Sequence, residues 1–183
     1  MSMMKRMILA AFVLTLLPAA LLAQSKFKYV GANACKACHL TPKSGAAFTI
    51  WQKSAHAKAF ATLATPAALE IAKKKGIADP QKDANCLKCH ETATGVPAAQ
   101  LAATFKAGEG VGCEACHGPG SDYKSMQVMK DLDSGKTKGE AVGFKKGSDE
   151  KFCVTCHNSE SPTYKGFNYA EYSKKIAHPT PKQ

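Results

Sequence analysis

Residues 110–123 read Gly-Val-Gly-Cys-Glu-Ala-Cys-His-Gly-Pro-Gly-Ser-Asp-Tyr, with Cys113-x-x-Cys116-His117 at the centre. The same Cys-x-x-Cys-His pattern occurs three more times and accounts for all 8 cysteines of the chain. We number these motifs along the chain: Cys35, Cys38 and His39 form motif 1; Cys86, Cys89 and His90 form motif 2; Cys113, Cys116 and His117 form motif 3; Cys153, Cys156 and His157 form motif 4. The rest of the chain has to be organised around this repeat.

The spacing within each motif is typical of the attachment of a c-type haem. Two cysteines three residues apart share one face of a helical turn, so both thiols can form thioethers with the vinyl groups on one porphyrin edge. The histidine that follows is placed to bind the iron as its proximal ligand. Paired disulfides and zinc sites are the alternatives for such cysteine pairs, but neither explains a histidine after each second cysteine. The pattern therefore predicts four covalently bound haem c groups.

The beginning of the chain has the features of an export signal. Lys5 and Arg6 are followed by an apolar run over residues 7–17 and by small residues up to Ala23, after which we expect cleavage. An uncleaved membrane anchor is the alternative, because the apolar run is close to spanning length. We expect residues 1–23 to be removed, residues 24–183 to form a single tetrahaem domain in the periplasm, and the mature chain not to be an integral membrane protein.

The composition predicts a thin protein core. Only 8% of the residues are aromatic, and glycine, proline and lysine interrupt most of the chain. Four haems would supply large apolar surfaces on which helices can pack. We therefore expect a mainly α fold in which helices and loops wrap round the four haems, and an apoprotein that is largely unfolded.

The basic charge does not indicate a nucleic-acid partner. Lys5 and Arg6 contribute two of the +11 charges, so +9 remain after cleavage. Arg6 is the only arginine, and the mature chain has none of the bidentate guanidinium groups that nucleic-acid readers favour. The lysines are expected to form a solvated surface, with a docking patch for an acidic redox partner as the alternative.

Two histidines and two methionines outside the motifs are candidate iron ligands. His56 lies on an amphipathic helix expected over residues 48–63, and His178 ends an expected final helix before Pro179. Four irons have about eight axial positions, whereas the chain has 6 histidines. Two positions must be filled otherwise or left open. Met126 and Met129, on a helix expected over residues 122–131, are the candidates for one of them.

The Trp51-x-x-Ser54-x-His56 segment, the Gly112–Gly120 segment and the closing Ile176-Ala177-His178-Pro179, together with the four motifs, resemble the tetrahaem cytochrome c-554 family. The resemblance implies a mostly helical fold around closely packed haems in stacked pairs. It also implies that His56 binds the iron at motif 4, that His178 binds the iron at motif 3, and that the iron at motif 2 is five-coordinate. The family takes a distal histidine for its first haem from just after the third motif, whereas residues 121–129 contain none. Met126 is the expected substitute there, and a second open haem is the alternative.

The expected function is electron transfer between redox proteins, and we expect no enzymatic role. The resemblance implies that a hydroxylamine-oxidoreductase-like enzyme or a membrane quinol-linked cytochrome is a partner. A redox enzyme that acts on NO, nitrite or hydroxylamine at an open haem of His90 is the first alternative. Glu91 and Thr92 are near that haem in the sequence, but neither is assigned as a proton donor. A subunit of a conductive cytochrome filament is the second alternative.

Overall fold

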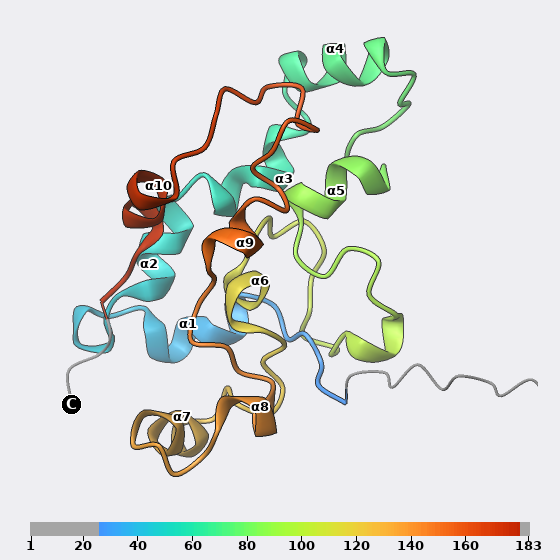
Figure 1. Ribbon diagram of the computed structural model, residues 1–183. Coiled ribbons are helices and arrows are strands. Elements are labelled where there is room, and N and C mark those ends of the chain that lie inside the picture. Colours follow the sequence, from blue (N-terminus) through green and yellow to red (C-terminus); the bar gives the residue numbers. More distant parts are fainter. Residues whose placement is uncertain (1–25, 180–183) are drawn as a thin grey trace, which may run out of the picture.

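The computed structural model describes residues 26–179, and this part of the chain folds as short helices joined by loops (Figure 1). Its elements are α1 (Asn33–His39), η1 (Pro42–Ser44), α2 (Ala47–Lys53), η2 (His56–Lys58), α3 (Ala59–Thr62), α4 (Pro66–Lys74), α5 (Ala84–His90), η3 (Ala98–Gln100), α6 (Cys113–His117), α7 (Met126–Asp133), α8 (Gly139–Val142), α9 (Glu150–Cys153) and α10 (Tyr169–Ile176), where η marks a 3₁₀ helix. The only β pairing in this range is an isolated bridge between Tyr29 and Leu101. The prediction of a mainly α fold is confirmed.

The predicted export signal, residues 1–23, lies outside the described residues. Among residues 26–179, no helix has both the length and the apolar character that crossing a membrane requires.

Each motif lies on or at the end of a short helix, and acidic residues begin two of these helices. The Asp83 carboxylate accepts a hydrogen bond from the N–H of Asn85 at 2.9 Å and begins α5. The Asp149 carboxylate accepts from the N–H of Phe152 at 2.9 Å and begins α9. A cap at residues 148–150 is also what the sequence predicts, because acidic residues are favoured in the first turn of a helix. Figure 1 shows α1, α6 and α9 in the middle of the molecule, with α5 beside them. The motif helices therefore gather at the centre.

The helix predicted over residues 48–63 is broken, and that part of the prediction is wrong. Ser54 has an extended backbone with ψ 164°, which ends α2. Its hydroxyl oxygen accepts a hydrogen bond from the N–H of Ala57 at 3.4 Å, so a new turn begins at η2. As a consequence, His56 lies at a corner between two helices rather than within one.

Two other predicted helices have different bounds. The helix expected over residues 122–131 begins at Met126, because the Ser125 hydroxyl oxygen accepts from the N–H of Val128 at 3.3 Å and forms the cap. The sequence also predicts a short helix from about residue 98 to 105, after the chain break at Gly95 and Pro97, but only η3 forms there. Leu101 is extended there and takes part in the bridge to Tyr29.

The sequence also predicts a helix that begins at Pro66 after Thr65 and ends at Gly76, and α4 matches this prediction. It begins with Pro66 after Thr65, whose hydroxyl oxygen accepts a hydrogen bond from the N–H of Ala68 at 3.3 Å. The backbone N–H of Gly76 donates to Lys73 O at 3.1 Å just after the helix, and Gly76 has φ +69°. Proline at the start and glycine past the end are the expected signals for a helix of this length.

The apolar core of the described chain is small. Its buried apolar side chains are Val30, Ala32, Phe48, Leu63, Ala72 and Tyr123. Two of these are alanines, which bury little apolar surface. This agrees with the expectation that the polypeptide supplies only part of its own interior.

Candidate haem-binding centre

The four motifs contact one another in a continuous series. The side chains of Cys35 and Cys113 hydrogen-bond each other, which raises the pKa of the Cys35 thiol and lowers that of Cys113. This contact joins motif 1 to motif 3. Cys116 of motif 3 and Phe152, which directly precedes Cys153, line one hollow, so motif 3 lies near motif 4.

Motif 4 in turn contacts motif 2. The Cys156 thiol donates to the backbone carbonyl of Lys88, inside motif 2, with a sulfur–oxygen distance of 3.8 Å. Burial raises the pKa of the Cys89 thiol to about 11, and the Cys156 thiol adds to the rise. The spatial order of the motifs is therefore 1, 3, 4, 2, which differs from their order in the sequence.

All eight motif cysteines have free thiols in this structure. A free pair on each motif is what thioether formation with a porphyrin requires, whereas a disulfide framework would consume it. A hollow of about 270 Å³ also lies next to Cys116 and is lined by Phe152. A thiol beside an open space with an apolar ring is a suitable environment for part of a macrocycle. The residues present fit a covalently bound haem.

Two histidines from outside the motifs lie opposite two motif histidines. The ring centroids of His56 and His157 are 6.0 Å apart, with an angle of 53° between the planes. Those of His117 and His178 are 5.9 Å apart at 52°. Two imidazoles that bind one metal ion from opposite sides, each through a nitrogen about 2 Å from the metal, have ring centroids about 6 Å apart. Both pairs therefore have the separation that a shared iron would need.

Backbone carbonyls hold two of the motif histidines in one tautomer. Nδ1 of His90 lies 2.7 Å from the carbonyl oxygen of Ala59, and Nδ1 of His117 lies 2.9 Å from that of Lys145. Because a carbonyl oxygen only accepts, each Nδ1 must carry the hydrogen, which leaves Nε2 free to bind a metal. Burial is the main reason that the pKa values of four histidines lie below the ordinary value: His39, His56, His117 and His157. The neutral imidazole is the form that binds iron.

The segment before motif 3 holds His56 in its corner. The N–H of Val111 donates to the carbonyl oxygen of His56 at 2.9 Å, and the indole N–H of Trp51 donates to the carbonyl oxygen of Val111 at 2.8 Å. Gly110 has φ +79°, and a Cβ on it would lie 2.6 Å from the carbonyl oxygen of His56. Only glycine permits this close approach.

The remaining candidate ligands are placed differently. Met126 is 65% exposed, and Met129 lies on the same helix, α7, which Figure 1 shows together with α8 at one end of the molecule. Among the described residues, ring contacts pair His117 and His157 with second histidines, but not His39 or His90. The charge of His178 also contributes, after burial, to the low pKa of His39.

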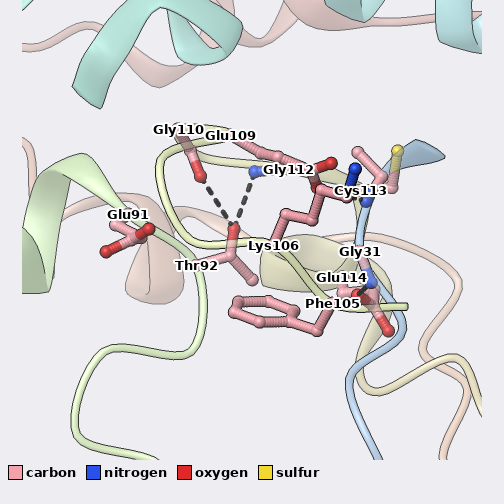
Figure 2. A pocket seen from close by; sticks show the side chains of 11 residues that line it. Gly31, Glu91, Thr92, Phe105, Lys106, Glu109, Gly110, Gly112, Cys113 and Glu114 are labelled. Carbon is pink, nitrogen blue, oxygen red and sulfur yellow. Dashed lines mark hydrogen bonds between the residues drawn. The ribbon is translucent and has the colours of Figure 1, made fainter. Parts of the chain in front are cut away.

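Glu91 and Thr92, which follow motif 2, are used in backbone hydrogen bonds (Figure 2). The Glu91 carboxylate accepts from the N–H of Gly108. The Thr92 hydroxyl accepts from the N–H of Gly112 at 2.7 Å and donates to the carbonyl oxygen of Gly110 at 3.2 Å. These contacts attach the end of motif 2 to the loop before motif 3.

Glu114 connects motif 3 to the segment before motif 1, a role that the sequence did not predict. It lies between the two cysteines of motif 3 and is 2% exposed. Its carboxylate accepts hydrogen bonds from the N–H groups of Val30 at 2.8 Å, Gly31 at 2.8 Å and Gly120 at 2.6 Å. The sequence feature that could have indicated this role is an acidic residue inside a motif that glycines follow closely.

Comparison with known proteins agrees with the motifs. A family model described as "Cytochrome c554 and c-prime" matches residues 34–118. Cytochrome c-554 of Nitrosomonas europaea is 34% identical over 152 residues, which are 75% of this chain and 61% of that relative, so the chain spans about three fifths of its length. The solved structure of reduced cytochrome c554 from Nitrosomonas europaea is 25% identical, with a TM-score of 0.49 and coverage of 81% of this chain and 78% of that one. From its motifs and these sequence matches, the chain belongs to the cytochrome c554 family of multihaem c-type cytochromes.

Proposed function

We propose that the haem-loaded protein is a periplasmic tetrahaem cytochrome that carries electrons between redox proteins. The observation that carries this proposal is the contact of the motifs in the series 1, 3, 4, 2. Bound haem c would supply a one-electron Fe(III)/Fe(II) couple at each motif. A chain that brings four attachment points into contact lets an electron enter at one motif and leave at another, with no substrate pocket required.

Eight cysteines and six histidines of this chain would hold the four haems. The thioethers form at the motif cysteines, and the proximal ligands are His39, His90, His117 and His157. The distal ligand at motif 4 is His56 and that at motif 3 is His178, which is supported by ring separations of 6.0 Å and 5.9 Å. The position at motif 2 is open. At motif 1, Met126 or Met129 is the proposed distal ligand, and an open position is the alternative.

The hydrogen bonds of Glu91 and Thr92 favour a carrier over an enzyme. Reduction or oxidation of NO, nitrite or hydroxylamine at the haem of His90 would need a proton donor on its distal side. The two polar residues that follow His90 are bound to backbone groups of the loop before motif 3. Both side chains therefore take part in structural hydrogen bonds, and neither is free to donate a proton at the haem.

The partners are redox proteins on both sides of the transfer. A hydroxylamine-oxidoreductase-like enzyme is the proposed donor, and a membrane quinol-linked cytochrome is the proposed second partner. The 23 lysines that remain after export would guide an acidic partner to the surface by long-range attraction. Nucleic acid is not among the proposed partners.

The test uses the purified holoprotein. Its mass should exceed that of the mature polypeptide by four haems, and reduced protein should exchange electrons rapidly with a partner cytochrome in stopped-flow experiments. Turnover of NO, nitrite and hydroxylamine should be negligible. A colourless folded protein would contradict the haem assignment, and substantial steady-state turnover of any of the three compounds would contradict the carrier assignment. Compact single particles in electron micrographs would exclude the filament.

A further inference from the structure

The carboxylate of Glu114 is almost completely buried and has an unusual set of partners. Only 2% of the residue is exposed. Oε1 accepts from the N–H groups of Val30 and Gly120, and Oε2 accepts from that of Gly31. The ion pairs found among the described residues involve other acids, namely Glu70, Asp79, Glu160, Asp131 and Glu171. Within this part of the chain, Glu114 is therefore satisfied by backbone dipoles rather than by a cation.

These partners favour the ionised form of Glu114. Every hydrogen-bond partner is a donor, so a protonated carboxyl group would have no acceptor for its own hydrogen. The pKa of Glu114 lies above its ordinary value because burial outweighs the N–H groups of Val30, Gly120 and Gly31, which act in the opposite direction. A carboxylate that accepts several backbone hydrogen bonds is stabilised in its charged form. The site thus holds one negative charge away from water.

The charge lies where motif 1 meets motif 3. Glu114 follows Cys113 directly, and two of its donors, Val30 and Gly31, come shortly before Cys35 in the chain. The side chains of Cys35 and Cys113 hydrogen-bond each other at the same junction. The haems attached by these two cysteines would both be close to the carboxylate.

A second carboxylate supports the same junction. Glu109 accepts hydrogen bonds from the N–H of Ala32 and from the side-chain amide of Asn33, both at 2.8 Å. These donors are at the beginning of α1, which carries motif 1. Glu109 is half-buried, so water screens its charge more than that of Glu114.

We propose that the Glu114 carboxylate holds down the reduction potentials of the haems at motifs 1 and 3. Reduction adds one negative charge to an iron centre, and a fixed negative charge nearby opposes this addition. Water would weaken the effect at the surface, but Glu114 is buried. The proposal rests on the proposed haem loading of the four motifs.

The decisive experiment compares Glu114→Gln with the unchanged holoprotein by spectroelectrochemical titration. The variant removes the charge and keeps the size of the side chain. We expect two of the four redox components to become easier to reduce by about tenfold in the ferric–ferrous equilibrium, which is about 59 mV for one electron. The other two components should stay unchanged. Glu114→Asp keeps the charge but alters the hydrogen bonds, so it should lower the unfolding midpoint with much smaller changes in potential.

A matched surface control is Glu160→Gln. Glu160 pairs with Lys88 at 2.6 Å beside motif 2, and its side chain is 69% exposed, so its removal should leave all four potentials nearly unchanged. Unchanged potentials in Glu114→Gln with four haems attached would overturn the proposal, and so would equal shifts in Glu114→Asp. If Glu114→Gln does not mature with its haems, Glu109→Gln is the substitute test. It should raise the reduction potentials at motifs 1 and 3 by a smaller amount, and unchanged potentials would overturn the proposal. A protein without haem would instead refute the proposed function.

Discussion

Replacement of Thr92 by valine tests the connection between motif 2 and the loop before motif 3. The Thr92 hydroxyl is the hydrogen-bond acceptor for the N–H of Gly112 at 2.7 Å, and the residue is 9% exposed. Valine has nearly the same shape, so packing is retained and only the polar interaction is lost. The carbonyl oxygen of Gly110 keeps its bond to the backbone N–H of Thr92 at 3.0 Å. The variant therefore leaves one N–H group, that of Gly112, without its partner.

The expected loss of stability comes from the unsatisfied N–H group of Gly112. An unsatisfied buried donor costs about 1–3 kcal/mol, and because Gly112 is only half-buried we expect the free energy of unfolding to fall by about 1.5 kcal/mol. This is about a tenfold change in the unfolding equilibrium. In a chain of this size it lowers the thermal midpoint by about 4 °C.

Guanidinium unfolding of the holoprotein, followed by far-ultraviolet circular dichroism, measures this change. Thr62→Val is the control, because the Thr62 hydroxyl donates to the carbonyl oxygen of Lys58 on an exposed helix at 2.9 Å. That variant should remain within about 0.5 kcal/mol of the unchanged protein. If Thr92→Val were as stable as the control, the hydroxyl would not be holding the loop, and the argument would be refuted.

Five further outcomes are expected. His178→Ala should convert one low-spin haem into a high-spin haem that binds CO, and an unchanged EPR spectrum would contradict the distal assignment. Gly110→Ala should destabilise the fold by more than about 2 kcal/mol in denaturant titrations, because its Cβ would meet a backbone oxygen as well as an unfavourable φ. Gly76→Ala, with φ +69° and no atom within 4 Å of the new Cβ, should cost only about 1 kcal/mol. Ala93→Gly should be neutral or stabilise by up to about 1 kcal/mol, because Ala93 has φ +63°. Protein made without haem attachment should lack cooperative unfolding in circular dichroism, since the buried apolar side chains are few.

The features that could be predicted from the sequence are those determined by neighbouring residues. The caps of α4 and α9 depend on Thr65 and Asp149, which lie within a few positions of the N–H groups that they accept from. The four motifs are equally local. The break at Ser54 could not be predicted in this way, because the apolar spacing of residues 48–63 continues across it. The corner depends instead on a contact between His56 and Val111, which are far apart in the sequence.

Long-range contacts also explain why the role of Glu114 could not be predicted. Its partners include Val30, which is 84 residues away, and no periodicity or motif joins the two positions. The approach of His56 to His157 likewise has no local signal and was expected only from the family resemblance. The series of motif contacts could not be predicted either, because the order 1, 3, 4, 2 depends on how the loops cross between helices.

The carboxylates of Glu109 and Glu114, which accept hydrogen bonds from the backbone just before α1, have a consequence for biogenesis. A ribosome makes the chain from its N-terminus, so Ala32 is synthesised 77 residues before Glu109, and Val30 84 residues before Glu114. The first motif therefore becomes available to the maturation apparatus before any acceptor for the preceding backbone exists. A chain that ended before residue 109 would lack both carboxylates, so the backbone before motif 1 would have neither of these acceptors.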